Sequence, residues 1–215
     1  MRCKLIIFLI SLTWAADLCV SQRSTVQNTR DLLIKRFKQK DCDALLKTIR
    51  RATSLNLSDA KLEDISFLSE APRLEVLLLR NNKITDLTPL LNLERLWWLD
   101  ISNNPISSFQ PLAKLQELNT LWASNTTVSE IEPLSNLSDL KYLSLEGNDI
   151  VDLTPITKLK KVEFLGLAKN KIENFQILEN LTRLKYVSLY ENPVRLCVNK
   201  RRCSWRDMCL KEKEP

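Results

Sequence analysis

A repeat of 22 residues constrains this chain more than any other feature of its sequence. The pattern L-x-x-L-x-L-x-x-N-x-I opens six times, 22 positions apart and without insertion or deletion, at Leu74, Leu96, Leu118, Leu140, Val162 and Leu184. Such a fixed period predicts a solenoid, in which each coil buries its apolar edge against its neighbours. Within the repeat LKYLSLEGNDIVDLTPITKL the apolar spacing changes from alternating to irregular. We therefore expect each coil to contain a short strand, a turn and a return arm.

Two segments of these repeats, NNKITDLTPLLNLERL and GNDIVDLTPITKLKKV, resemble the 22-residue leucine-rich repeats of the internalin-like family of secreted bacterial proteins. The resemblance covers residues 52–196, or about seven coils. It implies an α/β repeat solenoid: a curved, right-handed coil with a parallel β-sheet on its concave face and 3₁₀ or irregular turns on its convex face. It also implies that a protein partner binds to the concave face.

The first 21 residues have the pattern of an export signal. A basic start precedes an apolar run, Leu5 to Ala16, that is too short to span a bilayer. Small residues then lead to a cleavage site before Gln22. Lipidation of Cys19 is the alternative. A small residue usually precedes a lipidated cysteine, however, and Leu18 occupies that position here. The sequence therefore predicts a secreted or cell-surface protein with a signal at 1–21.

The segments on either side of the repeats are predicted to be caps of a single domain. Residues 22–51 are helical in pattern, with Leu33 and Phe37 on one face and a second apolar face after Asp41 or Asp43, either of which is available as the N-cap. An amphipathic helix across the first coil would remove its apolar edge from water. Residues 197–215 contain cysteines and are expected to close the other end.

Removal of the signal would leave four cysteines, three of them close together after the last repeat. Export permits disulfides, and we expect one among Cys197, Cys203 and Cys209. A zinc site is disfavoured because the chain has no histidine and no Cys-x-x-Cys pair. Cys42 lies at the opposite end, ~30 Å away at ~4.8 Å per strand, whereas bridged Cα atoms lie within ~7 Å. It is not expected to pair with these three.

The formal charge of +6 is concentrated at the two ends of the chain. Residues 22–51 contain nine basic and three acidic side chains, whereas residues 52–192 contain 14 basic and 19 acidic ones. A nucleic-acid-binding protein would more often have a continuous basic surface, so no nucleic acid is expected. Enzymatic function is disfavoured because no base, nucleophile or metal-ligand set converges. We expect no cofactor, no metal and no small-molecule substrate.

A column of amides follows the strand positions. It is expected to be structural, because an amide both donates to and accepts from backbone groups that a turn leaves unpaired. Its members are Asn82, Asn104, Asn148, Asn170 and Asn192, with Thr126 replacing asparagine in one repeat and Ala60 in the irregular first one.

Side chains alternate along a strand, so the residues between the core leucines are predicted to face the concave side. Several are aromatic, and aromatic residues dominate the energetics of binding sites. The predicted partner site consists of Val76, Leu78, Arg80, Trp98, Asp100, Trp122, Tyr142, Glu146, Phe164, Tyr186 and Tyr190. The alternative is that the aromatic rings only stack across strands and shield the sheet.

The leading hypothesis is a non-catalytic, monomeric recognition module that binds a protein through its concave face. A glycan or the cell envelope is a second possible target. A third reading is an intracellular scaffold of the phosphatase-regulator type, which shares the 22-residue repeat. The predicted export signal discriminates between the first and third readings.

Overall fold

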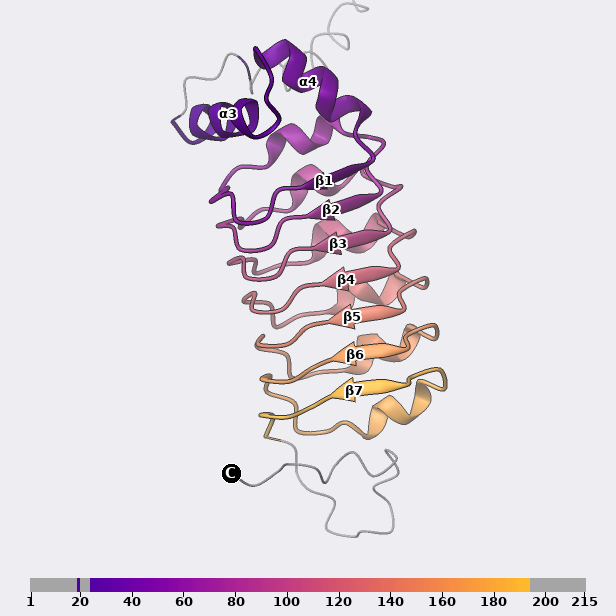
Figure 1. The fold of residues 1–215 in the computed structure, drawn as a ribbon. Helices are drawn as coiled ribbons and strands as arrows, with labels where there is room; N and C mark the ends of the chain where they lie inside the picture. The colour runs from indigo at the N-terminus through magenta and orange to yellow at the C-terminus, as the bar shows by residue number, and fades with distance from the viewer. Residues whose placement is uncertain (1–18, 20–23, 194–215) are drawn as a thin grey trace, which may run out of the picture.

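Seven short strands stack in sequence order into one parallel sheet (Figure 1). The computed structural model describes Cys19 and residues 24–193 of the 215-residue chain. The predicted C-terminal cap, with Cys197, Cys203 and Cys209, lies outside the described residues. So does the predicted signal, apart from Cys19. The strands are β1 (Ser54–Asn56), β2 (Val76–Leu78), β3 (Trp98–Asp100), β4 (Thr120–Trp122), β5 (Tyr142–Ser144), β6 (Phe164–Gly166) and β7 (Tyr186–Ser188).

Each strand pairs with the next at an offset of one repeat, as Leu77 with Leu99 and Leu99 with Leu121. The central residue of every strand points into the core and is buried. The leucines that open the repeats, such as Leu96 and Leu118, are fully buried beside them. Paired residues of adjacent strands are therefore 22 positions apart, which is the period of the sequence repeat.

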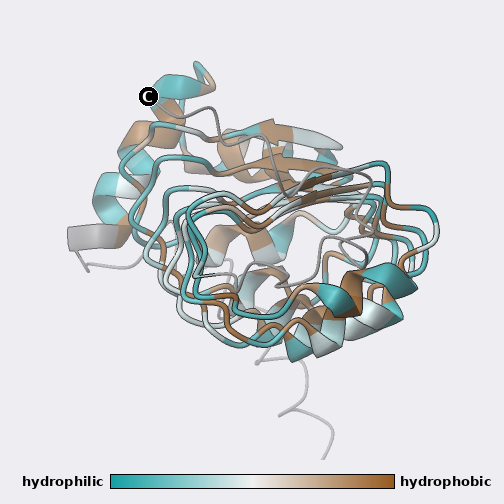
Figure 2. Cartoon of the chain, turned by 90° about the horizontal axis from the view of Figure 1, so that it is seen from below, coloured by the Kyte–Doolittle hydropathy of each residue, from teal (hydrophilic) through white to brown (hydrophobic). Residues whose placement is uncertain are grey.

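Short 3₁₀ helices lie on the side of each coil opposite the strands, which is clear when the solenoid is viewed end-on (Figure 2). A proline occupies the first turn of four of them, where its fixed φ fits and its missing N–H is not needed. They are η1 (Ser66–Glu70), η2 (Thr88–Leu90), η3 (Gln110–Lys114), η4 (Glu132–Asn136), η5 (Thr154–Lys158) and η6 (Gln176–Asn180). The predicted α/β solenoid with 3₁₀ turns is thus confirmed.

Two helices, α3 (Ser24–Arg36) and α4 (Cys42–Arg51), cover the β1 end of the solenoid (Figure 1). The Asp41 carboxylate caps α4 by accepting a hydrogen bond from the Ala44 amide at 2.8 Å. Leu45 and Ile49 of α4 are fully buried, and Arg50 forms an ion pair of 2.8 Å with Glu70 of the first coil. The helical N-terminal cap is confirmed.

A disulfide joins Cys42, at the start of α4, to Cys19, with 5.8 Å between the two Cα atoms. Removal of the predicted signal would take Cys19 away, and the C-terminal cysteines are expected to lie too far from Cys42, so the sequence predicts no partner for Cys42. The chain turns back between α3 and α4. This turn brings Cys19, which precedes α3 in the sequence, next to Cys42 at the start of α4. Sequence spacing alone did not reveal this proximity.

The asparagine column satisfies backbone groups inside the turns. The Asn104 side chain is 2% exposed; its Oδ1 accepts from the Ile84 amide at 3.0 Å, and its Nδ2 donates to the carbonyls of Leu79 and Ile101, both at 3.0 Å. The Asn82 side chain bonds the first, irregular coil in the same way. One repeat has Thr126 in place of the asparagine. The Thr126 hydroxyl donates a hydrogen bond to the side-chain amide of Asn148 in the next repeat.

A second, exposed ladder runs beside the first. Asn81, Asn103 and Asn125 adopt positive φ angles of 58°, 57° and 53°, a region that asparagine tolerates better than most residues. The Nδ2 of Asn125 donates to Asn103, which in turn donates to Asn81. The ladder ends at Gly147, where a Cβ would collide with the Asn125 side chain.

Among the described residues, no helix has the length and apolar character needed to cross a bilayer.

Candidate partner-binding site

The outer surface of the parallel sheet, here called the sheet face, is the surface that the sequence analysis assigned to the concave side. The first and third residues of each strand point away from the core, because the central residue points into it. Adjacent strands lie about 4.8 Å apart, so equivalent side chains of neighbouring coils touch. Large side chains at equivalent positions of adjacent coils can therefore pack against one another.

Three tryptophans form one aromatic group over β3 and β4. The ring centroids of Trp98 and Trp122 lie 5.8 Å apart with an interplanar angle of 64°, an edge-to-face arrangement. Trp97 tilts against Trp98 at 5.6 Å. Trp97 and Trp122 are each 39% exposed, whereas Trp98 is half-buried between them. The group presents a broad apolar surface to solvent.

The indole nitrogen of Trp98 is the least satisfied polar atom of this group. It is buried and has no hydrogen-bond partner among the described residues. A buried donor without an acceptor costs free energy, so this atom destabilises the fold locally at β3.

Tyrosines and a phenylalanine form a second aromatic group over β5 to β7. Phe164 and Tyr186 stack with ring centroids 4.8 Å apart and an interplanar angle of 8°. Tyr142 and Tyr186 are both 45% exposed, and Tyr190, just after β7, is 49% exposed. Their hydroxyl groups give this half of the surface a capacity to donate and accept hydrogen bonds.

Not every residue predicted for the site is accessible. Asp100 is only 5% exposed, and its carboxylate accepts a hydrogen bond from the Ser102 amide at 2.9 Å. In the sheet register it stands between Leu78 and Trp122, two larger side chains. Asp100 therefore braces the turn after β3 and offers little surface to a partner. Val76, Leu78 and Glu146 are half-buried, and Arg80 is exposed.

Paired charges border the second aromatic group. The Lys185 ammonium donates to Glu163 at 2.6 Å across neighbouring coils. This hydrogen bond lowers the pKa of Glu163 below its ordinary value of 4.5 and raises the pKa of Lys185 above 10.5, with the charge of each partner adding to the effect. Both groups are ionised at neutral pH, and their charges cancel beside Tyr186.

Sequence reasoning missed Trp97, which precedes β3 and lies outside the alternating strand pattern. The adjacent pair Trp97 and Trp98 was the available signal, because a core has little room for two consecutive tryptophans. Five of the aromatic residues that were predicted for the site lie on strands β3 to β7, and the sixth, Tyr190, follows β7. The five are Trp98, Trp122, Tyr142, Phe164 and Tyr186.

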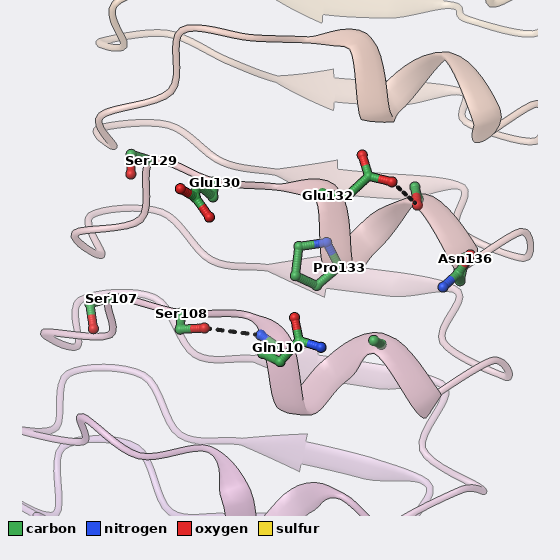
Figure 3. A pocket seen from close by; sticks show the side chains of 10 residues that line it. Ser107, Ser108, Gln110, Ser129, Glu130, Glu132, Pro133 and Asn136 are labelled. Carbon is green, nitrogen blue, oxygen red and sulfur yellow. Dashed lines mark hydrogen bonds between the residues drawn. The ribbon is translucent and has the colours of Figure 1, made fainter.

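A pocket of about 520 Å³ lies between two coils on the 3₁₀ side, beside η3 and η4 (Figure 3). Its lining is polar and partly self-paired: the Ser108 hydroxyl accepts from the Gln110 amide, and the Ser135 hydroxyl donates to Glu132. The Glu132 carboxylate also accepts from Lys158, and this bond lowers its pKa. The described residues include no group of three or more acidic or cysteine side chains placed to hold a metal. This pocket lacks the aromatic anchors of the sheet face.

Comparisons with known proteins agree with the architecture. The family of leucine-rich repeats (two copies) matches residues 72–114. No curated protein sequence matches the chain significantly.

Solved structures match over most of the solenoid. An internalin of Listeria monocytogenes, InlF, shares 27% identity over 78% of this chain and 57% of its own, with a TM-score of 0.62. Internalin C2 of the same species shares 27% identity over 79% of this chain and 85% of its own, with a TM-score of 0.58. A leucine-rich-repeat protein of Leptospira interrogans, at 23% identity and a TM-score of 0.66 over 71% of this chain and 40% of its own, is similar in fold alone.

This chain thus spans 57% of the length of InlF, less than two thirds of that protein. The repeat register, the sheet with its 3₁₀ turns and these likenesses agree with one another. The chain is a leucine-rich-repeat protein that is structurally similar to the internalins of Listeria.

Proposed function

We propose that this protein is an exported, non-catalytic recognition module that binds a protein partner through the sheet face. One observation carries the proposal: Trp97, Trp122, Tyr142, Tyr186 and Tyr190 remain 39–49% exposed on or beside a single sheet. Apart from Val151, they are the only large hydrophobic side chains with that exposure among the described residues. An exposed apolar surface of this kind typically marks an interaction site.

The rival explanation is that the rings only shield the sheet by stacking across strands. Stacking accounts for Phe164 against Tyr186 and for the half-buried Trp98. It does not account for the exposure of Trp122 and Tyr142, which lie on adjacent strands and still face solvent. Binding a partner would remove these rings from water.

Export is supported by three features. Residues 5–16 form the apolar run of an export signal, the N-terminal cap contains a disulfide, and the internalin-like proteins that the solenoid resembles are secreted or surface proteins. Disulfides persist in oxidising compartments and are rare in the cytosol. We propose a secreted or surface-associated location on these grounds.

The test compares sheet-face truncations with a matched apolar truncation elsewhere. Wild type, Trp122→Ala, Tyr142→Ala and Val151→Ala are immobilised and exposed to extracts of candidate cell surfaces, and retained proteins are quantified by mass spectrometry. Val151 is the control because it is apolar and 58% exposed but lies outside the strands. The partner is a protein that wild type and Val151→Ala retain and that both sheet-face variants lose.

The affinity of each variant for that partner then gives the contribution of the truncated ring to the binding free energy. Truncating a central aromatic anchor should weaken binding by about 2 kcal/mol, roughly thirtyfold. Thermal unfolding of each variant should match wild type closely, because the truncated rings are exposed. If both sheet-face variants retain the same partners as wild type, the aromatic rows are only a shield.

Pretreatment of the extract with protease separates a protein partner from a glycan. Loss of all specific retention supports a protein, whereas retention of carbohydrate that still depends on Trp122 would indicate glycan binding instead. An intact Met1 on chains found only in the cytosol would favour the intracellular scaffold.

A further inference from the structure

The disulfide of the N-terminal cap constrains how the chain is processed. Cys19 and Cys42 are both half-buried and pack against the hydrophobic core. Their Cα atoms lie 5.8 Å apart, within the range that a disulfide spans. The bond joins two residues that are 23 positions apart in the sequence, and the whole of α3 lies between them. Position 19 is thereby part of the folded cap.

The same residue lies inside the predicted export signal. Cleavage before Gln22 would remove Cys19 and leave the half-buried thiol of Cys42 without a partner. Lipidation of Cys19 would use its sulfur in a thioether, and that sulfur atom could not also form a disulfide. Removal, lipidation and disulfide formation are therefore mutually exclusive fates for Cys19.

We propose that the exported chain retains Cys19, that the signal is cut between Ala15 and Ala16, and that the Cys19–Cys42 disulfide fastens the new N-terminus to the cap. The inference rests on the export proposed above. A cut at this bond places Ala15 directly before it and Thr13 two residues further back, the small-x-small arrangement of signal cleavage sites. A cut one residue later would place the bulky Trp14 at the more distant position.

The second small-residue site, Cys19-Val20-Ser21 before Gln22, meets the same sequence requirement. Only the disulfide distinguishes the two, because only the earlier cut leaves both sulfur atoms in one chain. A tether of three residues, Ala16 to Leu18, would then precede the bonded cysteine.

The chemistry balances with two ordinary steps. Hydrolysis adds one water across the Ala15–Ala16 bond and yields a carboxylate and an amine. Oxidation removes two electrons and two protons from the two thiols, and a disulfide-bonded protein oxidant of the export compartment accepts them. One cysteine thiolate attacks the disulfide of the oxidant, the other displaces it from the mixed disulfide, and the oxidant leaves as a dithiol.

The bond has a measurable effect on the cap. By restricting the unfolded chain, closure of a loop of this length should raise the temperature at which the cap unfolds by about 5–10 °C. Cys19→Ser and Cys42→Ser should lower that temperature equally, and the double variant should unfold like either single one. Additive losses would show that the two residues act separately and would contradict the bond.

The decisive experiment analyses the full chain after expression in a bacterium with an oxidising periplasm. The exported protein is alkylated without reduction, digested, and mapped by mass spectrometry for its N-terminal peptide and its cysteine linkages. The expected result is an N-terminus at Ala16 and a peptide pair linked through Cys19 and Cys42. Each single Cys→Ser variant should gain one alkylated thiol, at the position of the remaining cysteine.

The other outcomes separate this inference from the proposed export. Exported protein that starts at Gln22 with an alkylated Cys42 overturns the inference and leaves export standing. An acyl-modified Cys19 also overturns it and indicates a membrane anchor. Chains that retain Met1 in the cytosol overturn export itself, and the inference with it.

Discussion

Replacing Asn104 by alanine is expected to destabilise the centre of the solenoid more than any surface change of the same size. The side chain is 2% exposed, so water does not readily replace its hydrogen bonds. Truncation of the Asn104 side chain leaves the Ile84 amide without its hydrogen-bond acceptor and the Ile101 carbonyl without its hydrogen-bond donor. The Leu79 carbonyl still accepts from the Asn82 side chain, at 2.7 Å.

Two buried backbone groups therefore lose their partners. Each orphaned group costs about 1–3 kcal/mol, so the free energy of unfolding should fall by roughly 2–6 kcal/mol. This is a large part of the stability of a typical domain, about 5–15 kcal/mol. Asn104→Asp should be at least as damaging, because it keeps an acceptor for Ile84 but presents an oxygen to the two carbonyls.

Urea denaturation followed by circular dichroism measures the change, with Asn92→Ala as the control. Asn92 is exposed, and its truncation should alter stability by less than about 0.5 kcal/mol. Hydrogen exchange should show the loss first at Ile84 and in the coils on either side of β3. A loss below about 1 kcal/mol for Asn104→Ala, with an unchanged denaturant slope, would refute the argument that this column holds the turns together.

The other predictions concern a turn, an ion pair and the cap. Gly147→Ala should cost about 1–2 kcal/mol in chemical denaturation, because φ is +67° and the new Cβ meets the Asn125 side chain. Gly166→Ala should cost less, since its neighbours are the ends of flexible side chains and its φ is not positive. The lowered pKa of Glu163 means that its stabilising contribution is present above pH 4.5 and is lost as pH falls through the folded pKa. Glu163→Gln should accordingly flatten the acid side of a plot of melting temperature against pH at low salt, and an unchanged curve would contradict this. Deleting residues 22–51 should expose the apolar edge of the first coil and cause aggregation in light scattering, whereas a monomeric, equally stable fragment would show that the cap is dispensable.

The period of the sequence was sufficient to predict a short strand, a turn and a return arm in every coil, because equivalent residues recur at a fixed spacing. The parallel sheet and the 3₁₀ turns were expected from the resemblance to the internalin-like family. Leu77 and Leu99 are both the central residue of a strand and both point into the core, so the environment of one predicts that of the other. The hydrogen bonds of Asn104 follow from the same logic, since every strand ends at an equivalent turn.

Features that depend on unlike neighbours could not be predicted in this way. Asp100 occupies an outward position, yet the larger side chains of Leu78 and Trp122 on adjacent strands leave it buried. The pairing of Cys19 with Cys42 depends on how α3 folds back, which lies outside any repeat. Alternation gives the direction of a side chain, and the size of its neighbours decides its exposure.

The constant offset of 22 residues between paired strands also determines which insertions and deletions the fold can accommodate. An in-frame loss or duplication of one whole repeat leaves every remaining inward residue beside an equivalent neighbour, so the core is preserved. A repeat duplicated between β4 and β5 would instead move the tryptophan group and the tyrosine group apart by about 4.8 Å. Recombination between repeats could thus lengthen or shorten the proposed recognition surface while the packing of the core stays the same.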